Sequence, residues 1–583
     1  MDSETKQCQN CKKDFIIEPD DFAFYKKMKV PSPTFCPSCR LQRRMAWRNE
    51  KSLYRRNCDK CKKSIISVFS TDSGLMVYCP SCWWSDKWDP IDYGTEYDIS
   101  RPFITQLREL LQRTPVMALF GYYNTLENSD YTNMVGYLKN CYLITNADHD
   151  ENCLYGSDII FCKDCVDNAM LTKSELCYEN LNCRECYRTI YSVNCESCSG
   201  VAFSKNCIGC SDCIGCINLR SKKYCIFNEQ FSKEEYDKKA AELLANSREK
   251  IDQIKYEAFS FWQKFPHKYM YGRHNQNVSG DYIFKSKNVK DSFSVQGGEN
   301  CRYCSIITVP TIANCYDFSH YGENCQLVYE ALQVGDQASR ILFTWFGTNG
   351  CQEIEYSMFT TGCRNIFGSV SLKKKEYCIL NKQYSKKDFE ELRARIIEDM
   401  YTNPYKDENG KTYAYGEFFP IEMSPFGYNA TTAQEDFPLT KEEILKLHYK
   451  WKEPEKNEYA VTITPVQLPD SSDQISDTYV KEVIGCKHNG QCNHRCSGAF
   501  RLTAAEINFY KKMNLPLPAL CSNCRHYERL SLRNPKKLWH RQCMCDKQHP
   551  HHTGKCPNEF ETSYAPDRKE IVYCEECYQT EVS

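Results

Sequence analysis

Residues 36–63 read CPSCRLQRRMAWRNEKSLYRRNCDKCKK, and residues 521–548 read CSNCRHYERLSLRNPKKLWHRQCMCDKQ. The two stretches align without a gap, and each has a pair of cysteines followed by regularly spaced arginines. The agreement extends upstream, where residues 24–28 (FYKKM) recur as residues 509–513. Agreement over so many positions indicates an internal duplication, so both ends of the chain should carry the same kind of module.

The N-terminal copy contains four C-x2-C pairs, Cys8/Cys11, Cys36/Cys39, Cys58/Cys61 and Cys79/Cys82. Such a short turn places two thiolates at adjacent corners of a zinc tetrahedron, so four pairs predict two sites. The simplest pairing is sequential, the first pair with the second and the third with the fourth. Four protein ligands close a zinc site to substrate, and we therefore expect structural zinc here.

The C-terminal copy departs from this pattern at the ligands. In the gapless alignment Cys8 falls on Asn493 and Cys61 falls on Asp546, so we predict Cys492 and Cys545 as replacements. Nearby competitors are Cys486, His488 and His494 for the first site, and Cys556, His549, His551 and His552 for the second. The predicted ligands are Cys492, Cys496, Cys521, Cys524, Cys543, Cys545, Cys574 and Cys577, which brings the expected zinc content to about four ions.

One pattern in the first copy resembles a zinc ribbon of treble-clef type: C-x2-C, then Phe15, Asp21, Phe24-Tyr25, a proline and Cys36-Pro37-x-Cys39-Arg40. The chain as a whole resembles a cysteine-rich family of small-genome candidate-phylum bacteria. This resemblance implies zinc binding and a shared architecture, and it assigns no activity.

The composition favours an intracellular metal protein over a disulfide framework. The chain has 583 residues, 39 cysteines, 75 basic residues and 76 acidic residues. We see no apolar leader at the N-terminus and no apolar stretch of membrane-spanning length, and C-x2-C spacing is typical of metal ligation. We therefore predict a cytoplasmic protein without membrane contact. Metal-bound thiolates would make it more acidic than its formal net charge of −1, so nucleic acid could bind only through local basic patches.

Cysteines between the two ends follow a different rule. Cys141, Cys162 and Cys183 are evenly spaced along the chain, and Asn precedes Cys repeatedly, as in Asn140, Asn152 and Asn206. A fixed short period, here about 21 residues, with many Tyr, Ile, Val and Phe predicts parallel β-solenoids with stacked like residues and Asn at the turns. The fold class is therefore mainly β and multidomain: duplicated paired zinc ribbons flank two solenoid blocks of about 21-residue period, each capped by a helix.

Core packing is the favoured role of the solenoid cysteines, because cysteine is small and readily buried. The run Cys207-x2-Cys210-x2-Cys213-x2-Cys216 is the one place where a metal or cluster is a competing hypothesis.

The domain prediction has eight parts. They are 1–90 paired zinc ribbons, 91–120 a linker with a helix from Phe103 to Arg113, 121–230 the first solenoid block, 231–260 a capping helix that begins with a Ser232/Glu235 capping box, 261–383 the second block, 384–402 a capping helix, 403–484 a linker with a helix near Lys441 to Tyr449, and 485–583 the second paired module.

The functional hypothesis rests on the arginines that follow the second cysteine pair in each copy. Basic residues with interleaved aromatics suit phosphate contacts and base stacking. The predicted nucleic-acid contacts, to RNA or DNA, are Arg44, Arg48, Arg55, Arg56, Arg529, Arg533, Lys536 and Arg541. An alternative role for the arginines is neutralisation of the thiolates, which we favour for Arg40 and Arg525.

We expect a zinc-binding, non-enzymatic binding protein, with a protein-interaction scaffold as the second function and a carbohydrate-type solenoid enzyme as the third. We recognise no nucleotide-binding or hydrolase motif. Trp83, Trp84 and Trp88 fit a packing seam better than an exposed docking patch. Protein partners remain possible, and the sequence leaves the oligomeric state open.

Overall fold

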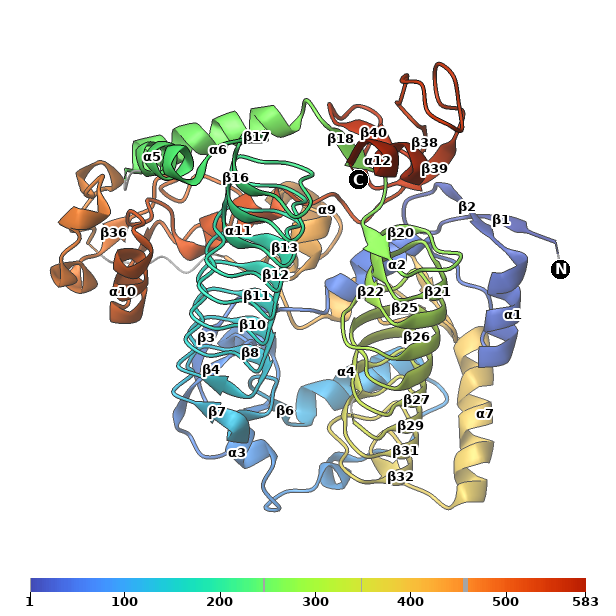
Figure 1. The fold of residues 1–583 in the computed structure, drawn as a ribbon. Coiled ribbons are helices and arrows are strands. Elements are labelled where there is room, and N and C mark those ends of the chain that lie inside the picture. The colour runs from blue at the N-terminus through green and yellow to red at the C-terminus, as the bar shows by residue number, and fades with distance from the viewer. Residues whose placement is uncertain (1, 245–246, 348, 454–459, 583) are drawn as a thin grey trace.

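The protein is mainly β, with many parallel strands, in a computed structural model that describes residues 2–244, 247–347, 349–453 and 460–582. Two stacks of short strands stand side by side, and smaller units from both ends of the chain pack around them (Figure 1). We call residues 126–230 column 1 and residues 272–383 column 2. None of the helices within the described ranges has the length and apolar character needed to cross a membrane.

Column 1 is a stack of 12-residue turns, so that Asn140 lies beside Asn152 of the next turn. Thr145 pairs in parallel with Ser157, Ser157 with Ala169, and Ala169 with Leu181. Parallel bridges recur at four points of each turn, at every third position, so each turn has four walls of three residues. Its strands are β7 (Leu126–Glu127), β8 (Asn133–Gly136), β9 (Leu138–Lys139), β10 (Thr145–Asp148), β11 (Ser157–Ile160), β12 (Ala169–Thr172), β13 (Leu181–Arg184), β14 (Ser199–Ala202), β15 (Ser211–Ile214), β16 (Lys223–Ile226) and β17 (Glu229–Gln230).

A left-handed residue at each corner produces this four-walled turn. Within column 1 almost every third residue has a positive φ, for example 50° at Leu143, 56° at His149 and 54° at Asn152. Asn tolerates this region better than most residues, which explains why it is frequent there. Asn140 and Asn206 also have a positive φ, as predicted for turns, and the corner amides stack: Asn140 Nδ2 donates to Asn152 Oδ1 at 3.1 Å.

The predicted 21-residue period is wrong as a repeat length, because the structure repeats in 12-residue turns. The inward-facing residue recurs at every third position, so any cysteine spacing divisible by three keeps both side chains in the interior, as for Cys141, Cys153 and Cys162. The step from Cys141 to Cys162 joins cysteines on different walls of the column. The cysteine spacing therefore indicated stacked turns correctly, but 21 residues is not the length of one turn.

Column 2 follows the same plan with longer turns in its middle. Gly280 pairs with Ser292, Gly298 with Ile312, and Gln326 with Ser339, so the step along the chain differs from turn to turn. Its strands are β19 (Gly272–Arg273), β20 (Gly280–Phe284), β21 (Lys287–Lys290), β22 (Ser292–Gln296), β23 (Gly298–Arg302), β24 (Ser305–Ile307), β25 (Ile312–Tyr321), β26 (Cys325–Val334), β27 (Ser339–Leu342), β28 (Trp345–Gly347), β29 (Gln352–Glu355), β30 (Met358–Thr360), β31 (Arg364–Phe367), β32 (Glu376–Ile379) and β33 (Lys382–Gln383).

Helices follow both columns. After column 1 the structure has two helices, α5 (Lys233–Leu243) and α6 (Arg248–Trp262), where a single helix was predicted. The predicted Ser232/Glu235 capping box at the start of α5 is confirmed. After column 2, α7 (Lys386–Thr402) runs beside the stack (Figure 1). The predicted helix α4 (Phe103–Arg113) is confirmed, and the connector after α7 holds β34 (Tyr405–Lys406), β35 (Thr412–Tyr413), α8 (Ala433–Asp436) and α9 (Lys441–Lys446). Residues 454–459 of the predicted linker lie outside the described residues.

The two ends of the chain fold into four small modules with related elements. Module 1 has β1 (Glu4–Gln7), β2 (Asp14–Ile17), α1 (Pro19–Met28) and α2 (Pro37–Met45). Module 2 has β3 (Tyr54–Asn57), β4 (Ser64–Ser67), β5 (Val77–Tyr78) and α3 (Pro80–Trp83), and β5 pairs with β6 (Val116–Met117). Module 3 has β36 (Ile484–Gly485), β37 (Ala499–Phe500), α10 (Ala504–Met513) and α11 (Ser522–Leu530). Module 4 has β38 (Trp539–Gln542), β39 (Glu559–Thr562), β40 (Ile571–Tyr573) and α12 (Glu575–Val582), and β40 pairs with β18 (Pro266–Lys268).

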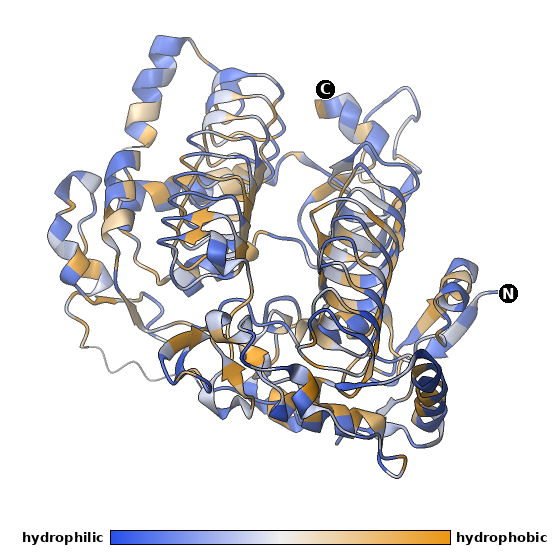
Figure 2. Cartoon of the chain, turned by 90° about the horizontal axis from the view of Figure 1, so that it is seen from below, coloured by the Kyte–Doolittle hydropathy of each residue, from blue (hydrophilic) through white to orange (hydrophobic). Residues whose placement is uncertain are grey.

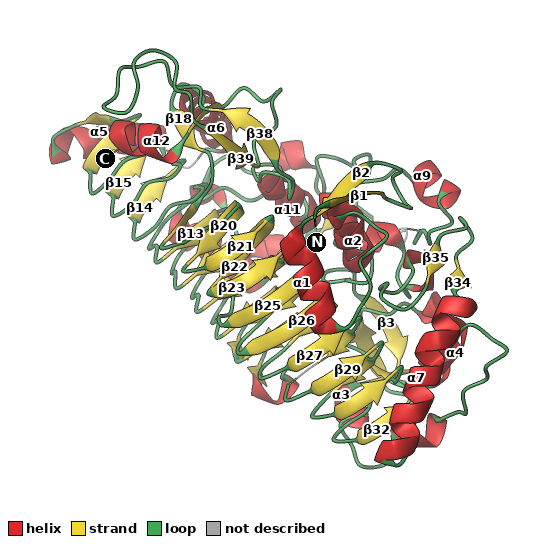
Figure 3. Cartoon of the chain, turned by 90° about the vertical axis from the view of Figure 1, so that its right-hand side faces the viewer, coloured by secondary structure: helices red, strands yellow, loops and turns green. Residues whose placement is uncertain are grey.

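Modules 1 and 3 pack against the columns in crossed order. Module 1, although first in the chain, lies on column 2, where Phe24 stacks on Tyr316 with ring centroids 3.8 Å apart. Module 3 lies on column 1, where Tyr510 meets Tyr178 edge to face. Figure 3 shows α1 lying over β25 and β26, and Figure 2 shows the columns as separate stacks joined by the segments around them. The N-terminal module therefore packs on the second column, and the C-terminal module packs on the first.

Candidate metal centres

All four modules place cysteines in the same two positions. The first pair lies in the turn of a two-stranded hairpin, and the second pair begins a helix, as at Cys36, Cys79 and Cys521. The backbone N–H that opens each helix donates to the sulfur of the first hairpin cysteine: Cys36 to Cys8, Cys79 to Cys58 and Cys521 to Cys486 at 3.3 Å each, and Cys574 to Cys543 at 3.2 Å. Such bonds stabilise a thiolate, so the local geometry suits metal ligation.

In the N-terminal modules the structure brings together the residues of the sequential pairing. One group is Cys8, Cys11, Cys36 and Cys39, the other is Cys58, Cys61, Cys79 and Cys82, and within each all sulfurs lie within 4.8 Å of one another. The Cys11 and Cys36 sulfurs are 3.8 Å apart, near the separation that zinc–sulfur bonds of about 2.3 Å give in a tetrahedron. Burial raises the pKa of Cys58, but N–H bonds from Cys79 and Cys61 outweigh burial and lower that pKa to about 7. The donors therefore fit zinc.

In the C-terminal modules the groups differ from the predicted ligand sets. The sulfurs of Cys486, Cys496, Cys521 and Cys524 form one group, and those of Cys543, Cys556, Cys574 and Cys577 form another. Cys486 and Cys556, which the sequence presented as competitors, thus occupy the places predicted for Cys492 and Cys545. Cys492 lies instead in a further group with His488, His494 and Cys524, and the Cys545 sulfur is 3.2 Å from His549 Nε2.

Longer hairpin turns account for this difference. In module 1 the Cys8 N–H bonds to the Lys13 carbonyl across a tight turn, whereas in module 3 Cys486 bonds to Gly498 and in module 4 Cys543 bonds to Asn558. In module 3, a gapless alignment followed backwards from the helix reaches Cys496 and then enters the longer turn, so it misses Cys486. In module 4, the same alignment followed forwards from Cys543 enters the longer turn and misses Cys556. The signal that could have found Cys486 is the strand β36 (Ile484–Gly485) directly before it, because the first cysteine of each module follows the first strand.

The module 4 loop directs histidines at one of its cysteines. His551 Nε2 lies 3.3 Å and His552 Nε2 lies 3.2 Å from the Cys577 sulfur. Cys577 also belongs to the group with Cys543, Cys556 and Cys574, so both C-terminal modules have additional ligand types next to a four-cysteine group.

The module 1 arginines predicted to face nucleic acid or thiolates are bound to column 2. Arg40 Nε donates to Asp317 Oδ2 at 2.8 Å, and Arg44 Nη1 donates to Glu330 Oε2 at 2.9 Å. Arg43 Nη2 donates to the other Glu330 oxygen at 2.6 Å. Burial raises the pKa of Glu330, but these guanidinium groups outweigh burial and hold it below its ordinary value. The arginines thus anchor the helix α2 in the wall of the column.

Module 3 repeats this anchor on column 1. Arg525 Nε donates to Asp167 Oδ2 at 2.7 Å, and Arg529 Nη1 lies 2.8 Å from Glu179 Oε2 as an ion pair without aligned hydrogen bonds. Asp167, Glu179, Asp317 and Glu330 are all corner residues with positive φ. The sequence offered no indication of these partners, because each lies hundreds of residues from its arginine.

Most of the predicted nucleic-acid contacts are therefore engaged inside the molecule. Arg44 is fully buried, Arg529 is 2% exposed, and Arg48 is bound to Glu50, Gln333 and Asn146. The other contacts are internal as well: Arg56 pairs with Asp59, Arg533 and Lys536 pair with Asp436, and Arg541 donates to the carbonyls of Tyr564 and Ala565. Among the eight predicted residues only Arg55 is exposed, and nucleic-acid contact by these side chains stays a prediction.

The column thiols have backbone partners. Cys165 Sγ lies 3.2 Å from the Lys163 carbonyl and 3.6 Å from the Ser174 carbonyl of the next turn, and Cys198 repeats this with Glu196 and Cys207. This arrangement agrees with the core role favoured from the sequence. The run from Cys207 to Cys216 places one buried cysteine on each wall of a single turn, so a metal there stays a hypothesis.

The tryptophans after Cys82 form mainly a seam with column 2. Lys373 Nζ lies 4.0 Å from the Trp83 ring centroid and 4.5 Å from that of Trp88, and Lys373 donates to the Trp83 carbonyl. Trp84 is the exposed member, at 51%.

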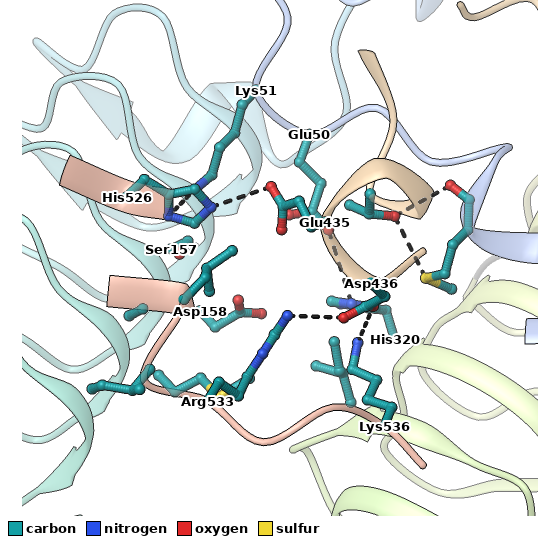
Figure 4. Close-up of a pocket in the computed structure, with 17 residues that line it drawn as sticks. Glu50, Lys51, Ser157, Asp158, His320, Glu435, Asp436, His526, Arg533 and Lys536 are labelled. Carbon is teal, nitrogen blue, oxygen red and sulfur yellow. Dashed lines mark hydrogen bonds and ion pairs between the residues drawn. The ribbon is translucent and has the colours of Figure 1, made fainter. Parts of the chain in front are cut away.

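A small polar cavity lies where both columns, the connector and the two ends of the chain meet (Figure 4). Lys51 Nζ is 2.7 Å from His526 Nδ1, and His526 Nε2 is 3.2 Å from Glu435 Oε1. Burial lowers the pKa of Lys51 to about 8, and burial together with nearby Glu50 raises the pKa of Asp158 to about 7. The cavity volume is about 20 Å³, which is room for about one water molecule and too little for a substrate.

Comparison with protein-family models and with curated proteins does not identify a relative. The chain matches no protein-family model and no curated protein. The functional conclusions below therefore depend on the geometry of the cysteine groups and of the columns.

Proposed function

We propose that this protein is a zinc-stabilised binding scaffold. In this proposal the four modules are zinc ribbons of treble-clef type, the two columns are parallel β-solenoids, and zinc holds each ribbon in the shape that fits its neighbours. The protein is cysteine-rich, and its four-cysteine groups could hold metal ions. The role of the ions is structural, because four protein ligands leave no open position for water or substrate.

One observation carries this proposal: the same N–H to sulfur bond recurs in four modules, although the hairpin turn is tight in two of them and long in the other two. Thiolates need such donors, and soft sulfur ligands in a tetrahedral arrangement favour zinc among common metals. The helices that carry the second cysteine pair of modules 1 and 3 also carry the buried arginines. A metal that fixes these helices would therefore also fix how the modules sit on the columns.

The experiment is a metal count with a structural readout. Protein purified with zinc should contain at least four zinc ions per chain by mass spectrometry of the elements. A strong chelator should then make residues 1–90 and 485–583 sensitive to protease while the far-ultraviolet β signal of the columns persists. Protein that contains no zinc, or that loses zinc without a change in protease sensitivity, would contradict the proposal.

The binding face is proposed to be column 1, where aromatic rings are exposed in a row. The His149 ring stacks between Tyr137 and Phe161, with centroids 4.5 and 4.8 Å away, and both of these aromatics are more than half exposed. Exposed large apolar side chains in a contiguous row are typical of an interaction surface. A protein partner is the first candidate, since aromatic anchors dominate protein interfaces.

Single-stranded nucleic acid is the second candidate, favoured by the same row because bases stack on exposed aromatic rings. RNA and DNA binding should be measured at several salt concentrations with wild type, with the Tyr137→Ala/Phe161→Ala variant and with Arg55→Glu. Binding that is lost in the aromatic variant and falls with salt would support nucleic acid. Absence of binding at low salt would leave the protein scaffold as the remaining candidate.

A further inference from the structure

Module 3 contains more metal-type ligands than one tetrahedral ion can use. Its hairpin loop, which closes through the Cys486 to Gly498 bond of 2.8 Å, carries His488, Cys492 and His494 in addition to Cys496. The ligand atoms of His488, Cys492, His494 and Cys524 lie within 4.8 Å of one another. Cys524 also belongs to the four-cysteine group, so two complete four-ligand sets share one sulfur.

The sulfur distances fit metals on both sides of Cys524. Its Sγ lies 3.8 Å from Cys486 Sγ in the first set and 3.7 Å from Cys492 Sγ in the second. Zinc–sulfur bonds of about 2.3 Å at tetrahedral angles place two sulfurs about 3.8 Å apart. The Cys524 thiolate is therefore placed to bind one ion with each of these neighbours.

The two histidines are half-buried, and each has a ring nitrogen without a hydrogen-bond partner in the described structure. The Nδ1 atoms of His488 and His494 are both inaccessible to solvent and have no hydrogen bond within the described part of the chain. Buried polar atoms almost always have a partner, so two such atoms beside a pair of sulfurs call for one. The Tyr527 ring stacks flat against His494, with centroids 5.2 Å apart, and so restrains the plane of the imidazole.

We propose that module 3 binds two zinc ions bridged by the Cys524 thiolate. One ion is held by Cys486, Cys496, Cys521 and Cys524, and the second by His488, Cys492, His494 and Cys524. The inference rests on the proposed zinc function and adds an ion that the four-site count lacks.

Charge favours the second ion. A lone zinc with four thiolates carries two net negative charges, whereas two zinc ions with five thiolates carry one. Burying less net charge costs less desolvation energy.

The test counts zinc in the full-length protein and in two matched variants. The His488→Ala/His494→Ala variant should contain one zinc fewer per chain than wild type. The His448→Ala/His540→Ala variant removes two exposed imidazoles that lie outside these groups, and its zinc content should not change. Cys492→Ser should lose the same single ion and serves if the double histidine variant does not fold, with circular dichroism as the check on folding.

The bridge itself predicts an unequal pair of losses. Cys524→Ser should lose two zinc ions per chain, whereas Cys39→Ser, the matching position of module 1, should lose one. Folded His488→Ala/His494→Ala and Cys492→Ser variants with the zinc content of wild type would overturn the two-ion centre and leave the four-site proposal intact. A wild-type protein without zinc would instead overturn the proposed function.

Discussion

Modules 1 and 3 share their attachment to the columns and differ in their hairpin turns. In both, a helix that begins at a cysteine turns its arginines onto acidic corners, which are the buried Asp317 and Glu330 in one case and the buried Asp167 and largely buried Glu179 in the other. The turn of module 1 is tight, whereas that of module 3 carries three additional potential ligands. The contacts that hold the parts together are thus shared by the two copies, while the exposed loop differs in ligand content.

The largest effect should come from removing the metal, which affects both ends of the chain. Structural zinc contributes roughly 10–16 kcal/mol in small isolated zinc modules, so a chelator should unfold modules 1 and 3 alike. Hydrogen exchange of the amides in α2 and α11 provides the measurement. If α2 and α11 keep their protection once all metal is gone, the arginine anchors rather than zinc determine the shape of the modules.

The next effect compares the two arginine anchors. Arg529→Met should lower the free energy of unfolding by about 3–5 kcal/mol. The reason is that Glu179, which is 10% exposed, has no other ion-pair partner in the described structure. Arg44→Met should cost less, since Arg43 still pairs with Glu330 and Arg40 with Asp317. Exchange rates in α11 and α2 should report the order. The reverse order would mean that the module 1 anchor depends on Arg44 more than its shared pairing indicates.

A smaller effect should appear at the cavity where the halves meet. The folded-state pKa of Asp158, about 7, lies above its ordinary value of about 3.9. The folded protein therefore keeps a proton that the unfolded chain releases, and its stability falls as pH rises from 4 to 7. The wild-type free energy of unfolding should fall by on the order of 2 kcal/mol between pH 5 and pH 8, and Asp158→Asn should remove this fall. Denaturation midpoints of the variant and wild type at both pH values are the measurement, and parallel midpoints would argue against the shift.

The smallest effect concerns modules 2 and 4, which use different contacts at equivalent positions. Trp83 of module 2 lies under the Lys373 ammonium, whereas Tyr578 of module 4 donates its hydroxyl to Asn218 Oδ1 at 2.9 Å. Lys373→Ala and Tyr578→Phe should each cost about 1 kcal/mol, by loss of the cation–π contact and of the hydrogen bond respectively. Hydrogen exchange of the amides in α3 and α12 is the measurement that can detect a change of this size. A change in the opposite module would indicate coupling that the contacts do not explain.

Local features of the sequence predicted local features of the structure. The C-x2-C pairs of modules 1 and 2, the capping box at Ser232 and the helix from Phe103 to Arg113 depend on residues close in the chain, and the structure brings each together. The Asn corners followed from the tolerance of Asn for positive φ. The sequence did not reveal the 12-residue turn length because cysteines occupy only some of the inward positions. Their spacing along the chain can therefore be another multiple of three residues, such as 21.

What the sequence could not show depends on distant contacts. The arginines looked like a basic surface because their acidic partners lie 277 residues away in one case and 358 in the other. The four-cysteine group of module 3 contains Cys486 in place of the predicted Cys492 because an inserted loop has no fixed length in an alignment. Corner carboxylates such as Asp167 and Glu179, one turn of the column apart, would have been recognisable only once the turn length was known.

The crossed packing sets a waiting time during synthesis. Arg40 emerges from the ribosome 277 residues before Asp317, which at 5–20 residues per second is about 14–55 s. Asp167 in turn waits 358 residues for Arg525, about 18–72 s. During both intervals a face meant for burial stays in water. The duration of translation, rather than the folding of any single module, should therefore limit how soon the two halves of this protein can close on each other.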